Sequence, residues 1–301
     1  MINKDTFAAY HPAVNMLYFT AVIGFSMFFM HPVCLFLSFI CASVYAVYLN
    51  GKKALLVGLL FLLPILIFTV LVNPLFNHQG ATILTYLPDG NPVTLESLVY
   101  GFAAAIMLIN VVTWFSCFNT VMTSDKFGYL LGRIIPALSL ILSMSLRLVP
   151  RFIRQIKVVS NAQKCIGQDI ACGSVFQRVK NGIRILSVMV TWTLENAIET
   201  ADSMKSRGYG LPGRTAFSLF RFDRRDGLAA AYILSCIIII ITGAVLEVYR
   251  FRYFPTIMQV TGKYNGGWSA ALFVVYFALF SFPLIINLKE DLIWKHIQSK
   301  T

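Results

Sequence analysis

The sequence predicts an all-α polytopic membrane protein with about six transmembrane helices and additional long amphipathic helices in the cytoplasm. First, 57% of its 301 residues are hydrophobic, whereas a soluble domain has about 45–50%. Second, several apolar segments approach the length of about 20 residues that a membrane-spanning helix needs. Third, most of the basic residues behind the net charge of +12 lie in one central block, which is typical of a cytoplasmic membrane face. No soluble domain remains that could use this charge to bind nucleic acid.

Six apolar segments are expected to cross the bilayer. They are Met16–Met30, Val33–Leu49, Leu55–Val72, Tyr100–Phe118, Leu228–Leu246 and Ser269–Ile286. The first two are separated only by His31 and Pro32, which predicts a tight helical hairpin. None of the six contains Asp, Glu, Lys or Arg. Ion-driven carriers usually place such residues at membrane depth, so the segments argue against an ion-coupled carrier and against acid–base catalysis within the membrane.

The distribution of Lys and Arg predicts that both termini lie in the cytoplasm. No Lys or Arg occurs between Lys53 and Lys126, so the polar loop 73–94 is placed outside. Between Lys126 and Arg225 there are five Lys and eleven Arg, which are 16 of the chain's 25 basic residues, and only five acidic residues. This stretch is therefore placed inside. Three basic residues do not follow this distribution, because they lie in a segment placed outside the cell: Arg250, Arg252 and Lys263.

These assignments divide the chain into three parts. Residues 1–125 are expected to form an N-terminal membrane domain of four spans, residues 126–225 a cytoplasmic region, and residues 226–301 a C-terminal hairpin of two spans. One further apolar segment, Gly128–Leu146, contains Arg133 as its single basic residue. A seventh span there would conflict with the charge distribution. We therefore expect one helix that is embedded in the bundle or packed beneath it.

The central region contains two amphipathic helices, each with an apolar face that needs a partner. The apolar face of the first is formed by Val149, Phe152, Ile153, Ile156 and Val159, and Arg147, Arg151 and Arg154 lie mainly opposite. The second carries an apolar stripe of Ile183, Leu186, Val190, Ala197, Ala201 and Met204, and a polar stripe of Thr191, Glu195, Glu199 and Asp202. Basic amphipathic helices can lie on anionic lipid. Lipid would repel the acidic stripe, which fits a protein partner better.

The second amphipathic helix is expected to end at Arg207, because a series of glycines and a proline begins at Gly208. A cation in the last turn can simply compensate the terminal carbonyl groups, which contributes about 0.3–1 kcal/mol. It can also project from the helix end as a fork of donors for a partner's carboxylate or carbonyl groups. The spacing of the residues leaves both readings open.

Three stretches of the sequence carry a resemblance to a known family. They are Ala-Asp-Ser-Met-Lys-Ser-Arg-Gly-Tyr-Gly at 201–210, Ser-Met-Ser-Leu-Arg-Leu-Val-Pro at 143–150 and Ala-Gln-Lys-Cys-Ile-Gly at 162–167. Together with His11-Pro12 they resemble the motifs of the transmembrane (T) subunit of energy-coupling factor (ECF) ABC importers, the family that includes the cobalt importer membrane subunit. In that family an Ala-Arg-Gly-like triplet ends each of two long coupling helices.

The resemblance implies particular site residues and partners. The ATPase-coupling residues would be Ser206-Arg207-Gly208 and Cys165-Ile166-Gly167 with Lys164, and the first coupling helix would start at Arg147 and Pro150. The chain would be a non-catalytic subunit without a cofactor, in the cell membrane of a prokaryote. Its partners would be two ABC ATPase subunits, a separate substrate-binding membrane (S) subunit and the lipid bilayer. It would transmit ATPase motion to the S subunit for the uptake of a vitamin or a metal ion.

The first triplet departs from the family pattern, because Ile166 stands where the family has an arginine. An isoleucine donates no hydrogen bond to a carboxylate. Either Lys164 supplies the charge from another face of the helix, or the contact is hydrophobic, which is the reading that we favour. An unequal pair of ATPase subunits would suit unequal helix tips.

Other function classes find less support in the sequence. There is no Gly-x4-Gly-Lys-Ser/Thr phosphate loop, so other chains would hydrolyse ATP. The histidines and cysteines lack the spacings of zinc sites, and Glu195 and Glu199 lack the Glu-x-x-His partner of a di-iron bundle. The main alternative is a conventional ABC importer permease that forms its own substrate path, although such permeases dock through one short loop. A membrane-embedded lipid-modifying or proteolytic enzyme would need polar catalytic groups within the spans.

Overall fold

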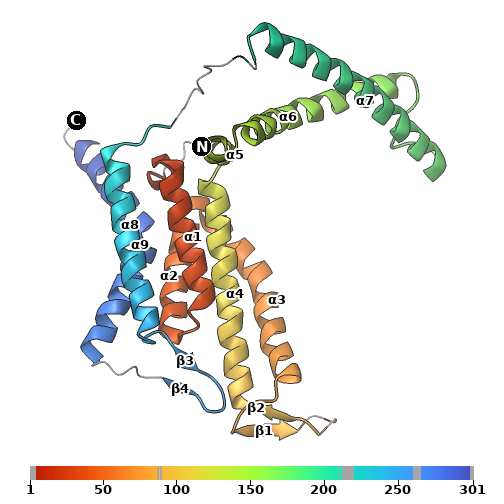
Figure 1. Cartoon of the computed structure of the whole chain (residues 1–301). Coiled ribbons are helices and arrows are strands. Elements are labelled where there is room, and N and C mark those ends of the chain that lie inside the picture. Colours follow the sequence, from red (N-terminus) through yellow and green to blue (C-terminus); the bar gives the residue numbers. More distant parts are fainter. Residues whose placement is uncertain are drawn as a thin grey trace. The chain divides into compact units, whose positions relative to one another are not determined.

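The structure is a computed structural model, and it describes residues 5–86, 88, 90–209, 211, 220–259 and 266–298. Within these ranges the chain is helical apart from four short strands, which confirms the all-α class (Figure 1). The chain forms two compact units. Unit 1 combines residues 1–123 with residues 220–301, and unit 2 comprises residues 124–219.

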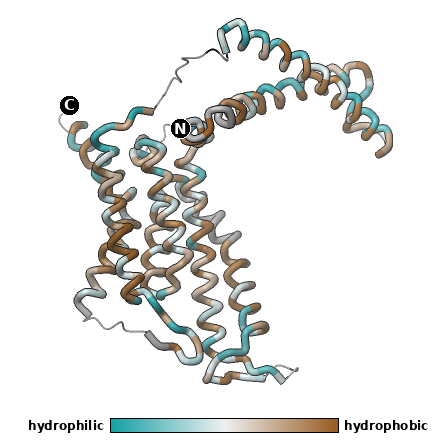
Figure 2. Tube along the Cα trace, viewed as in Figure 1, coloured by the Kyte–Doolittle hydropathy of each residue, from teal (hydrophilic) through white to brown (hydrophobic). Residues whose placement is uncertain are grey.

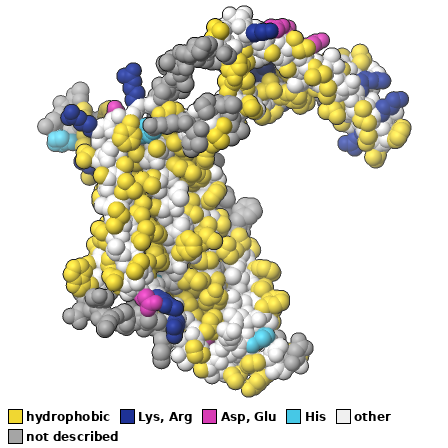
Figure 3. All heavy atoms as spheres, in the orientation of Figure 1, with side chains coloured by type: hydrophobic (Ala, Val, Ile, Leu, Met, Phe, Trp, Pro, Cys, Tyr) yellow, Lys and Arg dark blue, Asp and Glu magenta, His cyan; other side chains and the backbone are white. Residues whose placement is uncertain are grey.

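Unit 1 is built from long apolar helices. They are α1 (Pro12–Phe28), α2 (Pro32–Asn50), α3 (Lys52–Phe76), α4 (Leu95–Val121), α8 (Arg224–Val245) and α9 (Gly266–Gln298). Among the described residues, α2, α4, α8 and most of α9 are long and apolar enough to cross a membrane, and α1 and residues 62–76 of α3 are shorter apolar helices. The hydropathy of these helices is high along most of their length (Figure 2). On the face drawn in Figure 3, charged side chains lie towards the two ends of the unit. The protein is therefore a multi-pass membrane protein.

Two His-Pro pairs determine where the first two helices begin. His11 and His31 are the N-cap residues of α1 and α2, and Pro12 and Pro32 occupy the first helical positions. Each histidine Nδ1 accepts a hydrogen bond of 3.2 Å from the backbone N–H two residues further along. Proline suits the first position because its missing N–H would have no helical partner there. Both histidines are buried helix caps.

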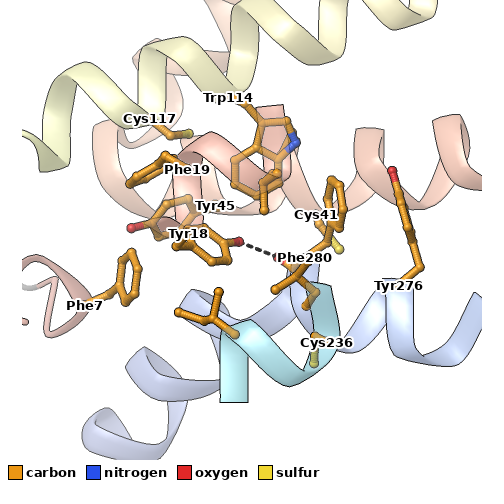
Figure 4. Close-up of a cluster of buried hydrophobic side chains, with 14 of the residues drawn as sticks. Phe7, Tyr18, Phe19, Cys41, Tyr45, Trp114, Cys117, Cys236, Tyr276 and Phe280 are labelled. Atoms are coloured by element: carbon orange, nitrogen blue, oxygen red, sulfur yellow. Dashed lines mark hydrogen bonds between the residues drawn. The ribbon is translucent and has the colours of Figure 1, made fainter. Parts of the chain in front are cut away.

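The core of unit 1 is aromatic, and several of its polar atoms are hydrogen-bonded to neighbouring helices (Figure 4). The Tyr18 hydroxyl donates to the Phe280 carbonyl at 3.1 Å, and the Trp114 indole N–H donates to Ser38 Oγ at 3.1 Å. Such bonds matter because a buried polar atom without a partner costs about 1–3 kcal/mol. Four of the six cysteines, Cys34, Cys41, Cys117 and Cys236, are buried here and behave as small apolar residues.

A buried polar cluster anchors the segment before α1 to two other helices. The carboxyl group of Asp5 accepts hydrogen bonds from Asn287 Nδ2 of α9 at 2.6 Å and from the Tyr45 hydroxyl of α2 at 2.9 Å. Asn287 Oδ1 in turn accepts the backbone N–H groups of Thr6 and Phe7, at 2.9 and 3.3 Å. The short 3₁₀ helix η1 (Phe7–Ala9) follows directly. Residues 282 positions apart in the chain thus lie in direct contact.

The start of α8 is attached to the same N-terminal segment. Asp226 Oδ1 accepts the backbone N–H of His11 at 3.0 Å, and its Oδ2 accepts that of Asp223 at 3.1 Å, so one buried carboxyl group also caps α8. The guanidinium of Arg225 lies 4.7 Å from the ring centroid of Tyr10. The chain enters α8 from unit 2, and this entry point is therefore held against the N-terminal segment.

Two small hairpins close the other end of unit 1, and the sequence did not predict their strands. They pair β1 (Ile83–Tyr86) with β2 (Pro92–Thr94), and β3 (Phe251–Arg252) with β4 (Met258–Gln259). A hydrogen bond of 3.0 Å from Ala81 N to the Pro255 carbonyl joins the segment before β1 to the loop between β3 and β4. The carboxyl group of Glu96, in the first turn of α4, accepts the backbone N–H and the hydroxyl of Thr82. The strands are too short to show a period-two pattern in the sequence.

Unit 2 consists of α5 (Ser124–Ile134), α6 (Pro136–Cys165) and α7 (Val175–Ser206). The prediction of a single helix over 128–146 was wrong, because the helix is interrupted at Ile135, between α5 and α6. Ile135 leaves the helical conformation, with φ −134° and ψ 89°, since the ring of a following proline disfavours the α region. The expected start of the first coupling helix was also wrong. Arg147 and Pro150 lie inside α6, which begins at Pro136.

The close packing of α3 against α4 can be tested at Gly101. A Cβ atom placed there would lie 3.0 Å from Asn73 Cβ and 3.4 Å from the Val70 backbone. We expect Gly101→Leu to lower the free energy of unfolding by about 1–3 kcal/mol, because overpacking forces neighbouring atoms apart. Thermal unfolding of the purified protein measures this change. Gly24→Leu is the matched control, since a Cβ there meets no atom within 4 Å, and an equal loss in both variants would contradict the packing argument.

Candidate coupling-helix tips

The two long helices of unit 2 pack against each other through few side chains. The ring of Trp192 in α7 lies 6.0 Å from that of Phe152 in α6, and the guanidinium of Arg151 lies 5.4 Å from the centroid of Trp192. Ile185 and Met189 of α7 are buried. Most other apolar side chains of α7 are exposed within the described part of the unit, including those of Ile183, Leu186, Val190, Leu194 and Ile198. The amphipathic pattern therefore leaves a broad apolar surface open to a partner.

The end of α6 has a specific backbone geometry. Cys165 is its last residue and Ile166 its C-cap, and Gly167 follows with φ +75°. The backbone N–H of Gln168 donates to the Gln163 carbonyl at 2.9 Å. A left-handed glycine with a hydrogen bond back over five residues is a Schellman motif. It turns the chain sharply, so that Ile166 is the last side chain presented by the helix.

The end of α7 repeats this geometry residue by residue. Ser206 is the last helical residue, Arg207 the C-cap, and Gly208 has φ +77°. The backbone N–H of Tyr209 donates to the Met204 carbonyl at 3.0 Å. Arg207 and Ile166 thus occupy the same position in two equal turns. The two triplets share the glycine, and the side chain at the tip is an arginine in one and an isoleucine in the other.

The side chain of Arg207 is exposed and available for a partner. Its guanidinium makes no hydrogen bond or ion pair to any residue within the described ranges, whereas the Ser206 hydroxyl is used locally and donates to the Ser203 carbonyl at 2.9 Å. The reading in which Arg207 only satisfies terminal carbonyls of its own helix finds no such contact among these residues. The geometry suits a carboxylate or a row of carbonyl groups on another chain.

The tip of α6 presents an apolar surface. Ile166 is 63% exposed. The nearest candidate cation, Lys164, has its Nζ 3.6 Å from Asp169 Oδ2, so its charge is matched within the same turn. The last side chain of the helix is therefore an exposed isoleucine, which gains free energy only against an apolar partner surface.

The two tips lie at opposite ends of α7. This helix has 32 residues, which span about 48 Å at 1.5 Å per residue. The connection that carries Ile166 is attached to the first turns of α7, and Arg207 follows its last turn (Figure 1). One long helix therefore separates the two tips.

The acidic stripe on α7 is exposed to solvent. Glu195, Glu199 and Asp202 lie on the surface of unit 2. Among the residues that the structure describes, no group of three or more His, Cys, Asp or Glu side chains is suitably placed for a metal ion. The three acidic side chains can therefore contact water or another protein.

Sequence reasoning missed the polar residues that shape the connection between α6 and α7. Asn181, in the second turn of α7, is buried, and its Nδ2 donates to the Asp169 carbonyl at 3.0 Å. Arg178 Nε donates to the Ile170 carbonyl at 2.8 Å. A signal was present, because Asn181 lies one turn before Ile185 on the face of α7 that is buried, where an amide needs a hydrogen-bond partner.

Comparisons with known proteins find matches over most of the chain. Residues 8–219 match the family CbiQ, described as "Cobalt transport protein", and this range includes both tips. The energy-coupling factor transporter transmembrane protein EcfT of Lacticaseibacillus paracasei is 28% identical over 224 residues, which are 70% of this chain and 82% of that protein. EcfT of Streptococcus equi is 30% identical over 210 residues, 65% of this chain and 73% of the relative. EcfT of Lactococcus lactis is 28% identical over 193 residues, 61% of this chain and 73% of the relative.

Proposed function

Because this chain belongs to the CbiQ family of cobalt transport proteins and is the transmembrane subunit of an energy-coupling factor transporter, we propose a division of work between its two units. Unit 1 is the membrane anchor. Unit 2 is the coupling module, which binds two ABC ATPase subunits and passes their motion to a separate substrate-binding membrane subunit that takes up a vitamin or a metal ion. The chain itself is non-catalytic.

The observation that supports this division is the pair of equal helix ends with unlike tips. A Schellman turn fixes the last side chain of each helix in a defined direction, at Arg207 and at Ile166. We propose that Arg207 binds acidic or carbonyl groups in a groove of one ATPase subunit, and that Ile166 enters an apolar groove of the other. Lys164 is then a local partner of Asp169, not a docking residue.

The mechanism is mechanical. Closure of the ATPase pair on binding ATP moves the two tips, and the long helices α6 and α7 shift as bodies because packed helices have few internal degrees of freedom. The exposed apolar face of α7 offers a contact for the substrate-binding subunit. We propose that unit 2 and both termini lie in the cytoplasm. The basic residues of the central block support this side. The N-terminal segment also contacts the start of α8 at Asp226 and the C-terminal half of α9 at Asn287.

Purification with bound partners tests the assignment against the alternative. A tagged chain extracted from membranes should bring with it two ATPase subunits and a small membrane protein that binds the substrate. A conventional permease that forms its own substrate path would bring ATPase subunits and a second copy of a permease, without a separate membrane receptor. A chain that is recovered without any ATPase would exclude both assignments.

Replacing Ile166 tests the chemistry of the first tip. We expect Ile166→Arg to weaken ATPase binding about tenfold, because a charge placed in an apolar groove must lose its hydration. Ile166→Val should stay close to the unchanged protein, since it keeps the apolar character. Binding of the purified ATPase pair to the chain in lipid nanodiscs measures both. Full binding by Ile166→Arg would mean that the groove accepts an arginine and that the two docking sites are alike.

A further inference from the structure

The connection between α6 and α7 is held in one conformation by side chains of α7. It runs from Ile166 to Gly173 and contains neither helix nor strand. Isolated segments of this kind populate many conformations, and ordering each residue costs free energy. Here, however, three α7 side chains make hydrogen bonds to successive residues of the connection: Arg184 Nη1 to Gln168 Oε1, Asn181 Nδ2 to the Asp169 carbonyl and Arg178 Nε to the Ile170 carbonyl.

The spacing of these three donors fits the path of the connection. Residues 178, 181 and 184 fall within about 120° of the helix circumference, since each residue turns by about 100°. Along α7 they run in the opposite order to their partners, because 184 binds 168 and 178 binds 170. The connection therefore lies antiparallel along the first turns of α7. One hydrogen bond also lies within the connection itself: Asp169 Oδ1 accepts the backbone N–H of Ala171 at 3.1 Å.

Asn181 is the central member of this set. It is the only one of the three donors that is buried, and its partner Asp169 also receives Lys164 Nζ. A single residue of the connection is thus joined both to the last turn of α6 and to the second turn of α7. The turn that presents Ile166 lies between these two attachments.

We propose that Asn181, supported by Arg178 and Arg184, is a positioning residue for the Ile166 tip, and that it keeps this docking element ordered before the ATPase binds. The proposal rests on the proposed function of the tip and adds the residues that shape it. Pre-ordering lowers the entropic cost of binding. Asn181 lies in the second turn of α7 and Arg207 follows its last turn, so loss of Asn181 affects one tip and not the other.

The test removes the amide donor and leaves the helix intact. Asn181→Asp has nearly the same shape but no N–H donor, and Asn181→Leu removes the donor without adding a charge. Asn196→Asp is the matched control, since Asn196 Nδ2 also donates to a backbone carbonyl, that of Trp192 at 2.9 Å, but within α7 itself. Each full-length variant is placed in lipid nanodiscs, and the purified ATPase pair that accompanies the chain is titrated onto it.

We expect both Asn181 variants to bind the ATPase pair about tenfold more weakly and to show faster amide hydrogen exchange at residues 168–172. The Asn196→Asp control should do neither. A double-mutant cycle separates positioning from general damage. Asn181→Leu should be non-additive with Ile166→Ala, because both act at the same tip, and additive with Arg207→Ala.

Unchanged ATPase affinity with faster exchange would overturn the positioning role, and so would non-additivity with Arg207→Ala. A failure of the proposed function looks different. In that case the unchanged chain would not bind the ATPase pair at all.

Discussion

Arg207→Glu should abolish uptake and reduce binding of the ATPase pair at least about 30-fold. Arg207 is the exposed C-cap of α7, with a guanidinium that makes no hydrogen bond or ion pair within the described residues. Truncating one partner of a desolvated charge pair costs about 2–5 kcal/mol, and a glutamate adds repulsion from the acidic groups that we propose to receive the arginine. Titration of the ATPase pair onto nanodiscs measures binding, and uptake by cells measures function.

Two further variants give this prediction its controls. Lys157→Glu reverses the charge of an exposed cation in the body of α6, and it should leave assembly close to normal because Lys157 lies about two and a half turns before Ile166 and belongs to neither tip. Arg207→Lys keeps the charge but loses the planar fork of donors, so we expect intermediate binding. Normal assembly and uptake by Arg207→Glu, with normal membrane insertion, would remove Arg207 from the docking site.

Asn287→Ala should lower the free energy of unfolding by about 2–4 kcal/mol. Its amide serves three groups at once: it donates to Asp5 Oδ1, and its oxygen accepts the backbone N–H groups of Thr6 and Phe7. Asn287 is almost fully buried, so water does not readily replace these bonds. Each buried polar group without a partner costs about 1–3 kcal/mol. Thermal or denaturant unfolding of the purified protein measures the loss.

The cluster around Asp5 also predicts how this substitution combines with another. Asp5→Ala and Asn287→Ala should be clearly non-additive, because both break the same hydrogen-bonded cluster. Asn77→Ala is a suitable control, since Asn77 Oδ1 accepts only a local hydrogen bond from Gln79 N at an exposed site, and it should change stability little. Additive effects of the first pair would show that Asp5 and Asn287 stabilise the protein independently.

Much of the architecture could be predicted from the sequence because the relevant signals are local. A run of apolar residues indicates a membrane helix wherever it occurs. The end of α7 was also predictable, since a glycine at the position after the C-cap favours the left-handed conformation that ends a helix, and the end of α6 was implied by the family resemblance. The contrast between Ile166 and Arg207 was visible for the same reason, and the structure places the two residues in equal turns.

Other features depend on which residues meet in space, and these were missed. The break at Ile135 was overlooked because the apolar pattern continues across it, although Pro136 was a local warning. The pairing of Lys164 with Asp169 was open in the sequence, since either residue could equally have faced solvent. The hairpin strands β1 to β4 pair over a few residues only, which is too short for a periodic signal.

By itself the sequence determined that this protein is a helical membrane protein, where α7 ends, and that its two helix tips differ in chemistry. These follow from composition, periodicity and glycine positions, which act within a few residues of the chain. Only the tertiary structure decided that Asn181 supports the Ile166 tip and that Asp5 is joined to Asn287. The physical reason is that a hydrogen bond between side chains on different elements depends on packing, and packing is set by contacts that no local pattern records.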